Sequence, residues 1–60
     1  MEEKQKAAKY LAEEFGVSEA IALVALDHAR GSIPQAKALL SSEMSRQLFG
    51  REVREYGLES

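Results

Sequence analysis

The chain has 60 residues, of which 45% are hydrophobic and 30% charged, and its formal net charge is −2. A chain this short forms one small domain, which buries only about 60% of the surface that its unfolded form exposes. It contains no cysteine, so disulfides and thiolate metal sites are excluded. Its lysines and arginines are scattered and outnumbered by acids, which argues against a nucleic-acid partner.

The hydropathy pattern also argues against a membrane partner. The longest apolar run, Ala20 to Leu26, is seven residues long, whereas a membrane-spanning helix needs about 20. The opening residues MEEKQK lack the apolar segment of a secretory signal peptide. We therefore expect a cytoplasmic protein.

The first part of the chain predicts an all-α fold, because nearly every residue up to Ala29 is a good helix former. A first helix is expected from about Glu3 to Phe15. Its apolar residues recur on one helical face: Ala8, Leu11, Ala12 and Phe15. Gly16 suits the left-handed position just after this helix.

Two further helices are expected around a tight corner. Ser18 is suited to cap a second helix that extends to about Arg30 and is stopped by Gly31. Ser32 and Gln35 then form an S-x-x-Q capping box, with Pro34 in the first turn of a third helix. Four apolar residues form the predicted inward stripe of this helix: Ile33, Ala36, Leu39 and Leu40.

The last third of the sequence has two interpretations. The third helix runs on to Phe49 and stops at Gly50, or it breaks at Ser41–Ser42 and a fourth helix begins there. In both cases, residues 51–56 form a helical piece that Gly57 ends, and Leu58 packs back on Val53.

Residues 5–40 resemble the ubiquitin-associated-like (UBA-like) domain, a three-helix fold also found in elongation factor Ts and in the nascent-polypeptide-associated complex. Phe15-Gly16-Val17 stands where ubiquitin binders have Met-Gly-Phe or a similar triplet, and Ala25-Leu26 matches an Ala-Leu pair on the second helix. Gly31-Ser32-Ile33 matches the Gly-Asp/Asn-Val/Ile corner, and Ala36 and Leu40 follow at the expected spacing. We therefore expect a compact three-helix UBA-like bundle over residues 1–42, with a helical C-terminal extension over residues 43–60.

The resemblance implies a non-catalytic module that binds another protein and needs no cofactor. Its implied partner-binding residues are Phe15, Gly16, Val17, Leu39 and Leu40. Ubiquitin is one candidate partner. However, the chain has Lys37 and no acid between Ile33 and Leu40, where ubiquitin binders usually carry an acidic residue.

A second apolar surface follows from the residues themselves. If the second helix has Ala22, Leu23, Ala25 and Leu26 inward, then Ile21, Val24 and His28 form a stripe on its other side. A domain this small should not leave such a stripe in water. Matching apolar groups follow in the extension: Leu48, Phe49, Val53 and Tyr56. We expect the extension to pack on the second helix, within one chain or across a homodimer.

Two other classes of function are an enzyme and a DNA-binding protein. An enzyme is not expected, because no catalytic set or metal site can be assembled around the lone His28. The segment LAEEFGVS also fits the turn of a helix-turn-helix DNA-binding protein. The next helix, SEAIALVALDHA, offers no Arg, Lys, Asn or Gln to read base edges, so DNA binding is only an alternative.

Overall fold

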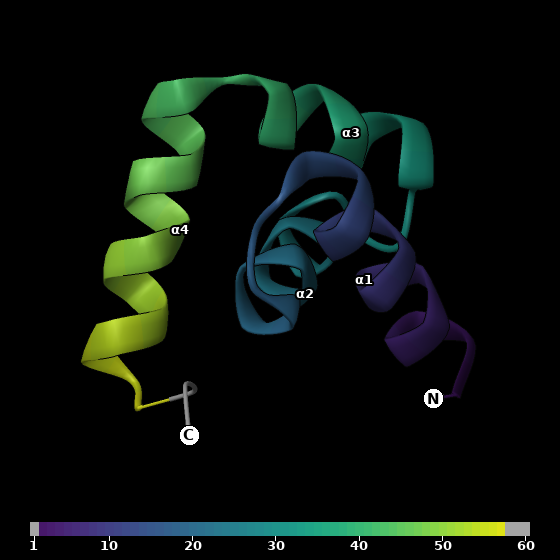
Figure 1. Ribbon diagram of the computed structural model, residues 1–60, viewed down its shortest axis with the longest axis horizontal. Helices are drawn as coiled ribbons and strands as arrows, with labels where there is room; N and C mark the ends of the chain where they lie inside the picture. Colours follow the sequence, from purple (N-terminus) through teal and green to yellow (C-terminus); the bar gives the residue numbers. More distant parts are fainter. Residues whose placement is uncertain (1, 58–60) are drawn as a thin grey trace.

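The computed structural model describes residues 2–57, which fold into four helices (Figure 1). They are α1 (Glu2–Phe15), α2 (Glu19–His28), α3 (Ile33–Ser41) and α4 (Glu43–Glu55). The prediction of an all-α fold is confirmed, since the described residues contain no strand.

Helices α2 and α3 form the middle of the bundle, because each of them contacts all three other helices. Helix α1 packs against α2 and α3, while α4 packs against α2 and α3 from another side (Figure 1). The chain therefore turns back after α3, and this turn brings α4 alongside α2.

The corner between α1 and α2 has the predicted geometry. Gly16 has a φ of 66°, in the left-handed region that glycine adopts without steric cost. The N–H of Val17 donates to the carbonyl of Ala12 at 3.0 Å, which closes the end of α1. Ser18 caps α2, since its hydroxyl accepts from the N–H of Ile21 at 3.1 Å.

The end of α2 differs from the prediction. The helix ends at His28, not at Arg30. The N–H of Arg30 donates to the backbone carbonyl of Asp27 at 3.1 Å, and the N–H of Gly31 donates to the carbonyl of Leu26 at 2.9 Å. These two bonds are those of a Schellman end, and they place Arg30, not Gly31, in the left-handed position directly after the cap. Arg30 has a φ of 54° and Gly31 a φ of 84°.

The N-terminus of α3 shows half of the predicted capping box. The hydroxyl of Ser32 accepts from the N–H of Gln35 at 3.4 Å, and Pro34 lies in the first turn. The reciprocal bond from the Gln35 side chain is not made. In that bond the Gln35 side chain would accept from the N–H of Ser32. This N–H already donates to the carbonyl of Ala29 at 3.1 Å.

The predicted inward stripe of α3 is only partly inward. Ala36 and Leu40, one turn apart, are fully buried. Ile33 is 39% exposed, because it is the first residue of the helix, where solvent reaches it. Leu39 is half-buried, because it lies about 100° around the helix from Leu40.

The chain breaks between α3 and α4 at a single residue. Ser42 ends α3 and caps α4, with its hydroxyl accepting from the N–H of Ser45 at 3.4 Å. The second of the two interpretations is therefore correct, and the predicted stop at Gly50 is wrong, because Gly50 lies inside α4. Gly57 follows the helix with a φ of 65°, as expected. The expected contact of Leu58 with Val53 lies outside the described residues.

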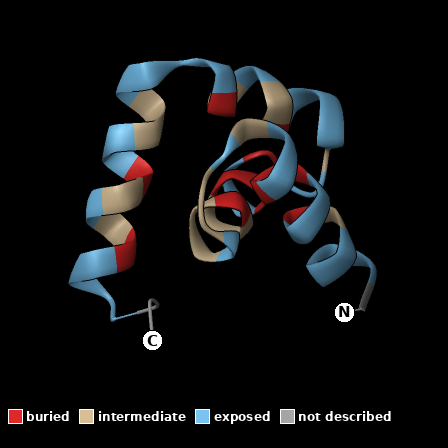
Figure 2. Ribbon diagram, viewed as in Figure 1, coloured by how far each residue is buried: buried red, intermediate tan, exposed pale blue. Residues whose placement is uncertain are grey.

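The core is built largely from small side chains. The structure assigns eleven buried hydrophobic residues to the part of the chain that it describes, and six of them are alanine. The larger buried side chains are Leu11, Leu26, Leu40, Phe49 and Val53. Figure 2 shows the buried positions of α4 on the side that faces the other helices, with exposed residues on its outer side.

Candidate functional site

The α4 helix docks on α2 through the ring of Phe49. Phe49 is 6% exposed and Val53 is fully buried, one turn apart on the inner side of α4. The ring of His28 stacks on Phe49 with a centroid distance of 5.2 Å and an interplanar angle of 26°. His28 Nε2 also donates to Oε2 of Glu52 at 3.0 Å. The C-terminal end of α2 is thus joined to the middle of α4.

The rest of the α2 stripe is partly covered. Ile21 and Val24 are half-buried and pack against the core. Ile21 reaches Gly50, where a Cβ would lie 3.9 Å from the Cδ1 of Ile21. Within one chain, α4 therefore lies over the stripe that the sequence singled out.

Two residues of the predicted second surface do not face α2. Leu48 is 54% exposed and Tyr56 is 71% exposed. Leu48 directly precedes Phe49, so it points about 100° away from the buried direction of α4. Tyr56 comes after the last residue of the helix, as its cap.

The predicted first surface is also divided. Phe15, Val17 and Leu39 are half-buried and pack against the core, while Gly16 is exposed. Leu40 is fully buried, so its assignment to a partner-binding surface is wrong. As a core residue of α3, it has no surface left to offer a partner.

An open groove joins parts of both predicted surfaces. Its apolar side chains are Leu39 from α3 and Leu48 and Phe49 from α4, with His28 at the end of α2. Its polar residues are Ser45, Arg51, Glu52 and Glu55. We call this the α3–α4 groove. Met44 precedes Leu48 by one turn and is 74% exposed, which extends the apolar surface along α4.

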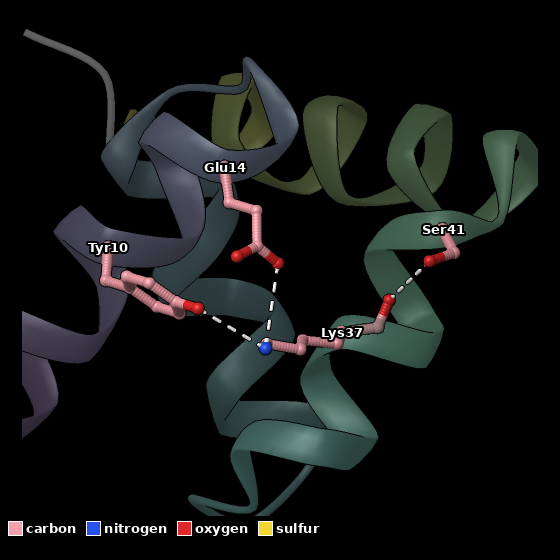
Figure 3. A network of polar contacts seen from close by, with 4 residues as sticks. All are labelled: Tyr10, Glu14, Lys37 and Ser41. Atoms are coloured by element: carbon pink, nitrogen blue, oxygen red, sulfur yellow. Dashed lines mark hydrogen bonds and ion pairs between the residues drawn. The ribbon is translucent and has the colours of Figure 1, made fainter.

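A polar contact on the other flank of α3 was missed from the sequence (Figure 3). Lys37 Nζ donates to the Tyr10 hydroxyl at 3.4 Å and lies 3.7 Å from Oε2 of Glu14. It also lies 5.3 Å from the centre of the Tyr10 ring. The Tyr10 hydrogen bond, followed by the negative charge of Glu14, raises the pKa of Lys37 above its ordinary value. This contact ties α3 to α1, so Lys37 is engaged within the domain.

Within residues 2–57, no group of three or more His, Asp or Glu side chains is arranged to hold a metal ion. None of the four described helices is long and apolar enough to cross a membrane. Comparisons of the chain with protein-family models, with curated proteins and with solved structures gave no match. The function must therefore be inferred from these side chains.

Proposed function

We propose that the chain is a non-catalytic protein-interaction module of the UBA-like type, and that its partner binds in the α3–α4 groove. The observation that carries this proposal is the exposure of Met44 and Leu48, one turn apart on α4, together with the half-buried Leu39, which lines the groove with Leu48. Large apolar side chains gathered at a groove commonly belong to an interaction site.

The groove fits an amphipathic helix of a partner protein. Such a helix places apolar side chains at i, i+3 and i+4 into a hydrophobic groove, and Leu39 and Leu48 would form the walls that receive them. Arg51 and Glu55 line the groove and make no ion pair within residues 2–57. They carry opposite charges, so an acid and a base on the partner would fix its direction.

The corners of the bundle support the UBA-like assignment. The resemblance requires tight turns after the first and second helices. Gly16 and Gly31 both have positive φ values at those two places. The Ala25-Leu26 pair, which the resemblance places on the second helix, is buried in the core.

Ubiquitin is less favoured than another protein. Leu40 is fully buried, so only Leu39 of the terminal leucine pair is accessible. DNA is less favoured still. Helix α2, the recognition helix of the helix-turn-helix alternative, packs against three helices. Its exposed residues include the acids Glu19 and Asp27, which phosphates would repel.

The experiment compares three forms of the chain. The double variant Met44→Glu/Leu48→Glu places charge on the groove side of α4, and Gln47→Glu is the matched control on the same helix. A partner captured by the wild-type chain should bind the control equally and the double variant at least about tenfold more weakly, as expected when central apolar contacts are lost. Circular dichroism would check that all three remain folded.

Two outcomes would contradict the proposal. One is equal binding of the partner to the double variant, and the other is the capture of nucleic acid alone. A titration of the labelled chain with ubiquitin is a separate measurement. Chemical-shift changes around Phe15–Val17 and Leu39 would favour ubiquitin instead.

A further inference from the structure

The connection between α3 and α4 is a single non-helical residue. Ser42 has a φ of −87° and a ψ of 121°. Its φ already lies in the range of an α-helix, so only ψ differs from the helical value. A rotation about this one bond would join α3 and α4 into a continuous helix.

The sequence around Ser42 is compatible with that continuous helix. Residues 39–44 contain neither glycine nor proline, the two residues that most disfavour a helix interior. Leu40, Met44 and Leu48 keep the i, i+4 spacing of one helical face across the break. The residue types of this segment therefore do not enforce the bend, and the Ser42 cap is the local interaction that favours it.

The backbone hydrogen bonds at the bend are fewer than a straight helix would make. The first N–H groups of α4 and the last carbonyls of α3 lack intrahelical partners, as at any helix end. In the bent form, the N–H of Ser42 donates to the carbonyl of Leu39 at 3.1 Å. The hydroxyl of Ser42 accepts from the N–H of Ser45 at 3.4 Å. Straightening would instead pair the N–H groups of Glu43 and Met44 with the carbonyls of Leu39 and Leu40.

The bend is also what returns α4 to its own chain (Figure 1). A straight hinge would carry Phe49 and Gly50 away from α2 and leave the Ile21 and Val24 stripe uncovered. A second copy of the chain presents an identical stripe, and its own α4 presents identical apolar side chains. If two copies exchange their α4 helices, the α2–α4 interface of each copy is formed again with the α4 of the other.

We propose that the chain forms a domain-swapped homodimer at high concentration, in which each α4 docks on α2 of the other copy and Ser42 is the hinge. The α2–α4 contacts are the same in the monomer and in the dimer, so the balance depends on the hinge and on concentration. This proposal does not depend on the α3–α4 groove as a partner site.

The hinge is tested with two opposite changes, measured by sedimentation equilibrium. Ser42→Ala removes the cap that only the bent form uses, and alanine favours the straight helix. It should raise the monomer–dimer association constant by about fivefold for each of the two hinges. A Gly-Ser-Gly-Ser insertion after Ser42 lets α4 fold back without constraint and interrupts the straight helix, so it should leave the chain monomeric.

Cross-linking separates a swapped dimer from a surface dimer, because the natural chain has no cysteine. One chain carries Ile21→Cys and another carries Gly50→Cys, two positions that meet only where α4 docks on α2. After joint refolding at high concentration and oxidation, a covalent heterodimer is expected. A mixture of Tyr10→Cys and Gly50→Cys chains is the control, and it should give none.

The Met44→Glu/Leu48→Glu variant should swap as the wild type does, so failure of the groove proposal and failure of this one are distinguishable. Three results would overturn the swap: a Ser42→Ala chain that stays monomeric at millimolar concentration, a dimer that survives the insertion, or a heterodimer yield no higher than that of the control.

Discussion

Arg30 has a backbone conformation that its side chain disfavours. Its φ of 54° is the one positive φ of a non-glycine residue between positions 2 and 57. In the left-handed region the Cβ of such a residue crowds the following carbonyl. The Arg30 side chain is exposed and makes no ion pair among the described residues, so no contact of that kind offsets the strain. The Schellman bonds at the end of α2 hold it there.

Replacement of Arg30 by glycine should therefore stabilise the domain. We expect Arg30→Gly to raise the free energy of unfolding by about 0.5–1 kcal/mol, the relief of strain less the added freedom of glycine in the unfolded chain. Urea denaturation measures the change. Arg30→Ala is the matched control, since it removes the charge but keeps the Cβ. An equal gain in the control would assign the effect to charge.

At the scale of the helix, Gly50 sits in the interior of α4 without a positive φ. A glycine there lowers helix stability, which is why its position after Phe49 predicts a helix end. The space beside it explains why it is tolerated. A Cβ at this position would meet only the Cδ1 of Ile21, at 3.9 Å, which is an ordinary contact distance.

The variant Gly50→Ala should raise the free energy of unfolding by about 0.5–1 kcal/mol, because alanine is the better helix former and its methyl group fits. Gly57→Ala is the contrasting variant. Gly57 has a φ of 65°, so the same change should destabilise there. Thermal unfolding of both would check the pair, and destabilisation by Gly50→Ala would mean that the added methyl group does not fit between α4 and Ile21.

These elements show which features can be predicted from the sequence. The caps at Ser18 and Ser32 and the turn at Gly16 depend on residues a few positions apart, so local patterns reveal them. The choice between a break at Ser42 and a stop at Gly50 cannot be made locally, because the apolar spacing runs through both. It depends on the packing of α4 against α2.

The contacts of the site residues also include some that local patterns in the sequence cannot reveal. The pairs His28–Glu52 and Tyr10–Lys37 are separated by 24 and 27 positions, and no spacing rule connects them. The resemblance to the UBA-like domain placed both Leu39 and Leu40 on one partner-binding surface. In the structure Leu40 is buried and Leu39 is half-buried. The packing of α3 against the other helices determines which of the two faces inward.

For the whole molecule, Phe49 is the side chain of α4 that joins the buried core. A domain of this size has a total stability of only about 5 kcal/mol. Phe49→Ala should remove about 3 kcal/mol of it, through lost burial and the cavity left behind. Leu48→Ala, at the exposed neighbouring position, should change stability by less than about 0.5 kcal/mol. Urea denaturation of both variants tests this, and equal losses would place Leu48 in the core.

The alanine-rich core changes how this domain responds to mutation. Alanine scanning identifies cores by cutting side chains back to a methyl group, and at six of the buried positions there is nothing to cut. Such a scan would overlook Ala22, Ala25 and Ala36, although all three are completely enclosed. Enlargement is what these positions resist, because a bulkier residue must push two helices apart. In a library that contains every substitution at each position, the largest losses of stability should therefore fall at residues that an alanine scan does not test.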